Sequence, residues 1–467
     1  MSLFNLFFDD EIISFLVEMT TLYAKRDRGH VDFETSADEI RLFLAILLLT
    51  GYNSLPRRRL YWENSDDVHC EAVTKAFSRN RFDLLVSCLH CSDNMKLQQG
   101  DKMAKIRPLY DLLNERCKTY APNMNDKSID EAMIPYYGRN NSKQRMQNKP
   151  VRVGYKLWVL AESSGYVIQF DPYCGAKAGN SCHASPTSWG LAEKVVLSLC
   201  EALPNDKAQH LYMDNYFTSF RLLDYLAGHN IKATGTIRAN KIRQCDIIDP
   251  KQLEKEERGH YQQRTACAEN GHVTCVGWND NRPVYVASNA DGIKPLTKVS
   301  RWSASENKRI MVPQPNVIHL HNKSMGGVDR CDQNVSKYRI SIRSKKWWWP
   351  LFAWPIDMAV QNSWILYRLW KDGDQPNMDL LSFRRCIVQT LLSKFDTRRS
   401  CSGRPRGRIL AGHKRVHADI RYDHVDHYQT LSKTQKRCAF CGKNTRKLCN
   451  KCDVGLHDHC FVDWHKY

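Results

Sequence analysis

Hydrophobic positions in the first 120 residues repeat every three to four places, the spacing of one buried face of an α-helix. The pattern is clearest at Ile12, Phe15, Leu16 and Met19, and again at Ile40, Phe43, Leu44, Leu47 and Leu48. This part of the chain is therefore predicted to be helical. A turn around residues 56–59 separates two of its helices.

The period changes to two from about residue 127, which is typical of strands that alternate between two faces. Three runs rich in β-forming residues, at 127–138, 153–162 and 165–173, are expected to lie in one sheet. The predicted order continues with a helix at 189–203, a buried strand at 210–213, a helix at about 218–229 and a strand at 231–237. Strands and helices in this order predict an α/β layered fold.

Short strands and turns fill residues 238–308, which favours a small β-rich insertion. Helical patterns return from 328 through 370 and again at 383–395. Residues 398–415 are polar and basic and contain glycine and proline, the composition of a linker.

Composition excludes several classes of protein. The 467 residues are 42% hydrophobic, enough to fill a core in two or more folding units, so the chain is not disordered. The longest apolar run, Leu42 to Leu49, is far shorter than the roughly 20 residues of a membrane-spanning helix. The first 20 residues lack the basic start and cleavage site of a secretory signal. We therefore expect neither membrane insertion nor secretion.

The net charge is +19, which indicates a polyanionic partner such as nucleic acid. Residues 398–467 hold 16 basic and 6 acidic residues and so contribute +10 of that excess. Of the 18 cysteines, thirteen are scattered over the first 401 residues without a spacing pattern, as expected of reduced thiols in an intracellular protein. The other five lie between residues 438 and 460 among histidines, where metal binding is the better interpretation.

Three aspartates stand where they could hold metal ions. Asp130 lies on a predicted strand, Asp214 ends another, and Asp329 follows a Gly-Gly pair at a helix start, with Asp332 one turn later. Taken singly, such an aspartate is more often a turn former or an N-cap. Together, three carboxylates can bind two Mg²⁺ ions for phosphoryl transfer. The sequence separations of 84 and 115 residues do not show that the three meet.

The C-terminal segment has the ligand spacing of a zinc module. Two C-x-x-C pairs, each able to supply two ligands from one turn, precede further cysteine and histidine residues. With His427 there are eight ligands, enough for two Zn²⁺ ions. The predicted sets are Cys438, Cys441, His457 and Cys460 for one ion, and Cys449, Cys452, His427 and His465 for the other. His424 and His459 are alternative donors, and interleaved RING or PHD modules that recruit proteins are a competing interpretation.

Three blocks contain the aspartates described above: SIDEAMIPYYGR (128–139), MDNYFTS (213–219) and MGGVDRCDQNVSKYR (325–339). They resemble the catalytic motifs of the piggyBac transposases and of the host proteins derived from them. Further similar blocks are GYNSLPRRRLYWE (51–63), KPVRVGYKLW (149–158) and ATGTIR (233–238), so the likeness covers nearly the whole chain. The chain departs from the family at its start, where it lacks the long acidic lead usual there; either the sequence is truncated or that lead was lost.

The resemblance implies an RNase H-like core with a β-rich insertion, flanked by a split all-α dimerisation and DNA-binding domain and by a C-terminal zinc domain. It implies that Asp130, Asp214 and Asp329 bind two Mg²⁺ ions, with Asp332 as a nearby acid. The implied activity is cleavage and joining of transposon ends at TTAA sites through DNA hairpins, by a nuclear homodimer. The expected segments are 1–125 (helical), 126–238 (core), 239–308 (insertion), 309–336 (core), 337–397 (helical), 398–420 (basic linker) and 421–467 (zinc domain).

Other basic residues are candidates for DNA contact. Lys345 and Lys346 precede three tryptophans, of which Trp347 matches a family tryptophan that can stack on an unpaired base. Burial of at least one of these tryptophans in the core is the simpler expectation. Arg57, Arg58 and Arg59 are equally well explained as a solvated turn. The run with Arg404, Arg406 and Arg408 resembles a minor-groove hook or a nuclear import signal.

Three hypotheses about function follow from these patterns. The first is a Mg²⁺-dependent DNA transposase that acts on double-stranded DNA. The second is a domesticated descendant that binds DNA or chromatin without cutting it. A zinc module that acts as a ubiquitin ligase on an inert scaffold is the third and weakest hypothesis.

Overall fold

The computed structural model describes residues 3–122, 124–147, 149–175, 188–204, 207–242, 245–371, 373, 376–395, 416 and 421–466. Contacts within the chain divide it into two compact units, Met1–Arg398 and Arg399–Tyr467. Within the described residues, none of the helices combines the length and hydropathy that crossing a bilayer requires.

The first unit begins with helices, as the hydrophobic period predicted. They are η1 (Phe4–Leu6), α1 (Asp10–Leu22), η2 (Tyr23–Asp27), α2 (Ala37–Thr50), η3 (Arg58–Trp62), α3 (Glu71–Ala76), α4 (Arg79–Cys88) and α5 (Arg107–Thr119). Side chains cap the first long helices, since Asp9 accepts from the Ile12 amide and Ser36 from the Glu39 amide. Helix α2 is buried from Leu42 to Thr50, so the longest apolar run of the chain is a core helix.

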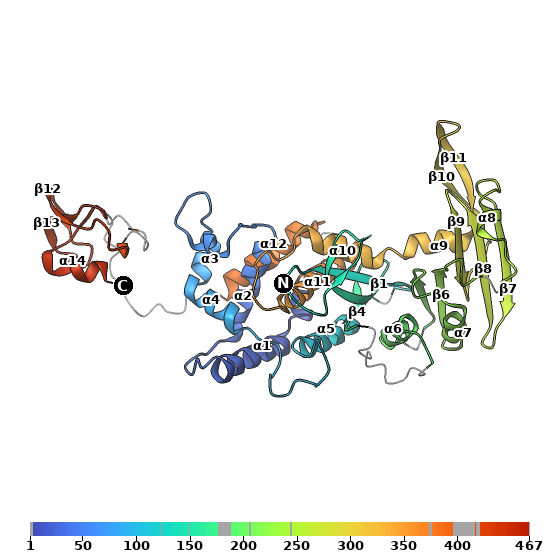
Figure 1. Ribbon diagram of the computed structural model, residues 1–467, viewed down its shortest axis with the longest axis horizontal. Helices are drawn as coiled ribbons and strands as arrows, with labels where there is room; N and C mark the ends of the chain where they lie inside the picture. Colours follow the sequence, from blue (N-terminus) through green and yellow to red (C-terminus); the bar gives the residue numbers. More distant parts are fainter. Residues whose placement is uncertain are drawn as a thin grey trace. The chain divides into compact units, whose positions relative to one another are not determined.

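Two later helices complete this helical part. Helix α11 (Trp349–Trp370) and helix α12 (Leu380–Lys394) pack against each other and against α2. A buried ion pair joins them, with Arg384 Nη2 2.8 Å from Asp357 Oδ1. Arg384 Nε also donates to the Leu48 carbonyl, and the Ile340 amide donates to Asp357 Oδ2. Segments more than 300 residues apart in sequence thus build one helical body, as the split helical domain requires (Figure 1).

A large mixed sheet lies beside the helical body. Its central strands are β1 (Asp126–Pro135), β3 (Val153–Glu162), β4 (Val167–Pro172), β5 (Gln209–Met213) and β6 (Ile231–Thr236), with β2 (Gln144–Arg145) at one edge. The order is β4-β3-β1-β5-β6; β3 runs antiparallel to β1 and β4, whereas β1, β5 and β6 run parallel. The three strands predicted as one sheet are confirmed. Helix α7 (Phe220–Gly228) connects the parallel neighbours β5 and β6, and helix α6 (Leu191–Cys200) lies between β4 and β5 in the chain.

The insertion continues the same sheet. Strand β9 (Pro283–Ser288) pairs antiparallel with β6, and β8 (His272–Asn279) and β7 (Tyr261–Cys267) follow in order. Beside them are α8 (Pro250–Leu253) and a hairpin of β10 (Thr297–Ser303) and β11 (Lys308–Gln314), which projects beyond β8 and β9 (Figure 1). The chain then returns to the core through α9 (Asn316–Ser324) and α10 (Gly327–Lys337), and α10 packs on β1 and β3.

The structure shortens some predicted helices. The pattern from 328 to 370 is interrupted, because α10 ends at Lys337 and residues 338–348 are not helical before α11 begins. The predicted helix at 189–203 spans only Leu191–Cys200. Such differences arise because a hydrophobic pattern marks a buried side and not a helix end. The fold class, an α/β core with a β-rich insertion, a split helical part and a small Cys/His-rich unit, is confirmed.

The second unit is a small sheet with one helix among its described residues. Strand β12 (Gln429–Arg437) pairs with β13 (Asn444–Cys449), which pairs with β14 (Val454–Gly455), and α14 (Asp458–His465) follows. Its buried cluster consists largely of cysteines, together with Val454 and Leu456. Apolar burial of this size stabilises a fold poorly, so bound metal is expected to supply the rest.

Candidate active site and metal centres

Two of the predicted acids follow paired positions on neighbouring strands. Strands β1 and β5 run parallel, and Ile129 is in register with Met213. The next residue on each strand is an aspartate, Asp130 in the middle of β1 and Asp214 directly after β5. Asp214 is half-buried, and its Oδ1 accepts from the Tyr216 amide at 2.7 Å. Asp214 therefore also has the turn-forming role expected of an aspartate at a strand end.

Helix α10 carries the third and fourth acids, Asp329 and Asp332, and packs on β1, the strand that holds Asp130. A Cβ at Gly327 would lie 2.3 Å from the Glu162 carbonyl oxygen, so only glycine allows the helix to start this close to β3. Asp329, in the first turn, has a side chain that is 72% exposed. Asp332, one turn later, has an Oδ1 atom that is buried without a hydrogen-bond partner.

Lys149 links two of these acids, and its role was not predicted. Its Nζ lies 3.3 Å from Asp130 Oδ2, 3.8 Å from Asp329 Oδ1 and 3.9 Å from Glu131 Oε1. An ammonium group thus lies between carboxylates that were predicted to share a divalent cation. The basic residues of the 149–158 block indicated that one of them could pair with an acid. Their spacing did not identify Lys149 as the one that reaches Asp130.

Burial dominates the electrostatics of the acids. It raises the pKa of Asp130 to about 7, although the Lys149 ammonium acts in the opposite direction. Burial likewise raises the pKa of Asp332 to about 7, against the effects of Lys149 and the Met133 amide. A nearby cation stabilises the charged form of a carboxylate and so acts against the rise in pKa that burial causes.

The acids offer the donors that a hard divalent cation prefers. They supply only carboxylate oxygens, and one of these oxygens, Asp332 Oδ1, is buried and unpartnered. Among the described residues, the sets of possible ligand atoms that all lie within 4.8 Å of one another are two Cys/His groups and not these acids. The chemistry of the donor set fits Mg²⁺, and in this structure the Lys149 ammonium lies between Asp130 and Asp329.

A second lysine lies beside the same acids. Lys156 Nζ is 3.7 Å from Glu131 Oε2 and sits 3.8 Å from the centre of the Trp158 ring. The ring of Tyr216, two residues after Asp214, stacks on the Trp158 ring, with 5.7 Å between the two ring centres. Glu131 and Lys156 were missed by sequence reasoning, because an alternating strand pattern does not separate a paired charge from a solvated one.

The C-terminal unit brings together two groups of four possible ligands among its described residues. They are His427, Cys449, Cys452 and His465, and Cys438, Cys441, His457 and Cys460. These are the sets that the spacing favoured, and the alternative donors His424 and His459 belong to neither. Thiol and imidazole ligands in fours suit tetrahedral Zn²⁺.

Hydrogen bonds orient the histidines of these groups. His465 Nδ1 lies 2.8 Å from the Phe461 carbonyl, which leaves Nε2 at 3.4 Å from the Cys452 sulfur. His427 Nε2 lies 2.9 Å from Asp423 Oδ1, and its Nδ1 is 3.3 Å from the Cys449 sulfur. In each ring one nitrogen is held by an oxygen while the other faces sulfur, the arrangement usual around zinc.

Comparison with known proteins decides the family. Residues 1–364 match a family model described as Transposase IS4. The chain is 41% identical over 465 residues to human PiggyBac transposable element-derived protein 3, covering 99% of this chain and 75% of that protein. The chain belongs to the piggyBac transposase family. It is also 36% identical over 466 residues to human PiggyBac transposable element-derived protein 2, covering 99% of this chain and 76% of that one.

A solved structure shares the fold of this piggyBac family member. It is a cryo-EM structure of a piggyBac transposase synaptic complex with hairpin DNA. The TM-score is 0.70 at 23% identity, with 98% of this chain and 96% of that chain covered. The likeness confirms that the α/β core, the insertion and the flanking parts follow the family fold.

The tryptophan run of this family member divides into buried and partly exposed rings. Trp348 and Trp349 are buried, as the simpler expectation stated. Trp347 is partly exposed; its ring packs edge-on to Tyr155 and its carbonyl accepts from the Tyr155 hydroxyl. Lys345 is exposed, whereas Lys346 donates to the Leu89 carbonyl and has its pKa lowered by burial to about 8. Arg404, Arg406 and Arg408 lie outside the described residues.

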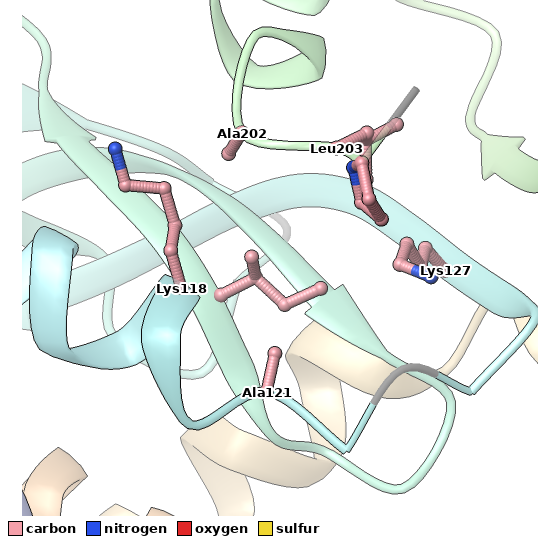
Figure 2. Close-up of a pocket in the computed structure, with 7 residues that line it drawn as sticks. Lys118, Ala121, Lys127, Ala202 and Leu203 are labelled. Carbon is pink, nitrogen blue, oxygen red and sulfur yellow. The ribbon is translucent and has the colours of Figure 1, made fainter. Parts of the chain in front are cut away.

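Figure 2 shows a pocket of about 280 Å³ in the first unit. Lys118 of α5 and Lys127 of β1 line it together with Ala121 just after α5, Ile168 of β4 and residues 202–204 after α6. The Lys127 ammonium donates to the Met124 carbonyl and to Gln209 Oε1. Its lining holds no carboxylate, so this pocket does not fit the metal chemistry of the family.

Proposed function

We propose that this protein is a Mg²⁺-dependent DNA transposase that cuts and joins transposon ends at TTAA sites through hairpin intermediates. The observation that carries the proposal is the set of acids around β1: Asp130 and Asp214 follow paired strand positions, and Asp329 reaches the same lysine as Asp130. Membership of a transposase family supports it.

Each acid would have a distinct part in the site. Asp130, Asp214 and Asp329 would hold two Mg²⁺ ions, which supply activation of the attacking oxygen and stabilisation of the leaving oxygen. Asp332 would support them from the next turn of α10, with its unpartnered oxygen available. Lys149 would hold the carboxylates in place in the metal-free protein and lie close to the phosphate of bound DNA, because its ammonium already faces the acids.

The remaining parts would bring DNA to this site. The two Cys/His groups would bind one structural Zn²⁺ each and hold a basic module against transposon ends. The net charge of +19 favours nucleic acid as the partner. We further propose a homodimer that works in the nucleus and holds two transposon ends.

Cleavage of labelled DNA tests the chemistry. The purified protein, incubated with candidate terminal repeats and Mg²⁺, should give nicks followed by hairpins, and Asp214→Asn should abolish both. Asp246→Asn is a matched control, because the Asp246 side chain is fully exposed. Loss of cleavage in both variants, or no cleavage by the wild type on any candidate repeat, would count against the proposal.

A second candidate is a descendant that binds DNA without cutting it. It is favoured by the names of the human relatives, which are transposable element-derived proteins. DNA binding with steep salt dependence, without Mg²⁺-dependent nicking, is the outcome expected of it. Many near-identical genomic copies flanked by inverted repeats would instead favour the transposase.

A further inference from the structure

The β10–β11 hairpin has one buried face and one exposed face. Side chains along each strand alternate, and those of Val299, Ile310 and Val312 point inward. They pack on a second hydrophobic cluster of the first unit, formed by Val276, Trp278, Val286, Val317 and Ile318. The inner face therefore attaches the hairpin to the extended sheet.

Polar contacts fix the hairpin further. Arg258 donates to the Trp302 carbonyl, and Asp280 pairs with Arg258 at 2.7 Å and with Arg301 at 2.9 Å. The Trp278 indole donates to the Pro313 carbonyl. A ribbon held from its inner side in this way presents its outer side in a fixed orientation.

The outer face carries large apolar side chains beside cations. The Trp302 side chain is 57% exposed and the Met311 side chain 60% exposed. Trp302 is opposite Arg309, and Met311 lies two positions farther along, so both project from one face. Lys298, on the same face, and Arg309 are exposed as well. Within the paired positions 297–303 and 308–314, the outer face carries no acidic residue.

Stability of this chain does not account for that surface. An exposed tryptophan or methionine side chain contributes little of the stabilisation that its burial would supply. Neighbouring exposed apolar side chains that are bordered by polar ones are typical of a surface where another molecule binds. A molecule that binds this face has to carry groups compatible with two cations and has to present a flat apolar surface.

We propose that the outer face of the β10–β11 ribbon is a docking surface for duplex DNA. A β-ribbon fits the major groove, which is about 12 Å wide. Lys298 and Arg309 would contact phosphates, while Trp302 and Met311 would lie against sugars and base edges. This inference rests on the proposed DNA-directed function, and it assigns a second DNA contact away from the acids and from the zinc unit.

The test uses the full-length protein and a fluorescein-labelled 30-base-pair duplex of mixed sequence. Binding is measured by anisotropy at several salt concentrations for Lys298→Ala with Arg309→Ala, and for Trp302→Ser with Met311→Ser. The charge variant should lower the slope of log affinity against log salt by about 1.8, because each lost phosphate contact removes about 0.9. The apolar variant should weaken binding at least about fivefold, because two apolar contacts are lost, and should leave the slope unchanged.

Matched controls separate this surface from general effects. Trp370→Ser removes an equally exposed tryptophan, and Lys251→Ala with Lys255→Ala removes two exposed charges. Both should bind like the wild type, and thermal melting should show every variant folded.

Each result decides between two claims. Wild-type protein that fails to bind duplex DNA overturns the proposed function. Wild-type binding that the ribbon variants leave unchanged overturns the ribbon inference alone. If the ribbon variants instead alter the mass of the protein in light scattering and not its DNA affinity, the face joins two copies of the chain, and the inference is wrong.

Discussion

Replacing Lys149 by methionine tests whether its ammonium occupies the place of a metal ion. At separations of 3.3–3.9 Å, each of its ion pairs is worth about 4–5 kcal/mol before desolvation, at an effective dielectric constant near 20. Desolvation offsets most of this, and the side chain is 21% exposed. We expect Lys149→Met to lower the free energy of unfolding of the metal-free protein by about 2 kcal/mol.

The same substitution should strengthen metal binding. If metal binding breaks the ion pairs of Lys149, the wild type loses about 2 kcal/mol of ion-pair energy when metal binds. The variant has no such ion pairs to lose. Mn²⁺ affinity should therefore rise about 30-fold in Lys149→Met, since 1.4 kcal/mol is a factor of ten. Calorimetric titration at pH 8.5, above the Asp130 pKa of about 7, keeps competition from protons small.

Lys232→Met is the control, because Lys232 is exposed on β6. Equal Mn²⁺ affinity and equal unfolding energy in the wild type and Lys149→Met would refute the reasoning. No Mn²⁺ binding by either protein would argue against the metal site itself.

Three further predictions concern other parts of the molecule. The folded-state pKa of Asp332, about 7, lies above the ordinary value of 3.8, so its contribution to metal-free stability is present below pH 4 and is lost as the pH rises to 7. The free energy of unfolding of Asp332→Asn, measured by denaturation at several pH values, should not show this decrease as the pH rises to 7. The purified protein should hold two Zn²⁺ per chain by a colorimetric release assay, and either Cys438→Ser or Cys449→Ser should reduce this to one. Arg384→Met should cost about 3–5 kcal/mol in denaturant unfolding by leaving Asp357 charged and buried, and Mn²⁺ affinity should stay unchanged.

Sequence patterns predicted the parts of this fold that depend on local order. The alternation in β1 and β3 and the helical period of α2 follow directly from which side of each element is buried. The residues around Asp130, Asp214 and Asp329 identified the family, which the comparisons confirm. The segment boundaries assigned from the sequence stay predictions, as do the metal and DNA roles of single residues.

Long-range pairing could not be predicted. Strand β9 joins β6, about 50 residues earlier, and no periodicity indicates that the insertion extends the core sheet. Lys149 reaches Asp130 only through the path of the backbone between β2 and β3. Lys345 and Lys346 are identical neighbours, yet one is exposed and the other half-buried, because the non-helical approach to α11 turns the second toward Leu89.

The continuous sheet has a mechanical consequence. Thr234 to Thr236 of β6 share backbone hydrogen bonds with Val286 to Ser288 of β9, so the insertion has no loose joint at that edge. A load on the hairpin would pass through its packed inner face to β8 and β9, and from there across the paired strands to β5, which Asp214 directly follows. If duplex DNA binds the ribbon as proposed, bending of that duplex and movement of the strand before Asp214 would be coupled.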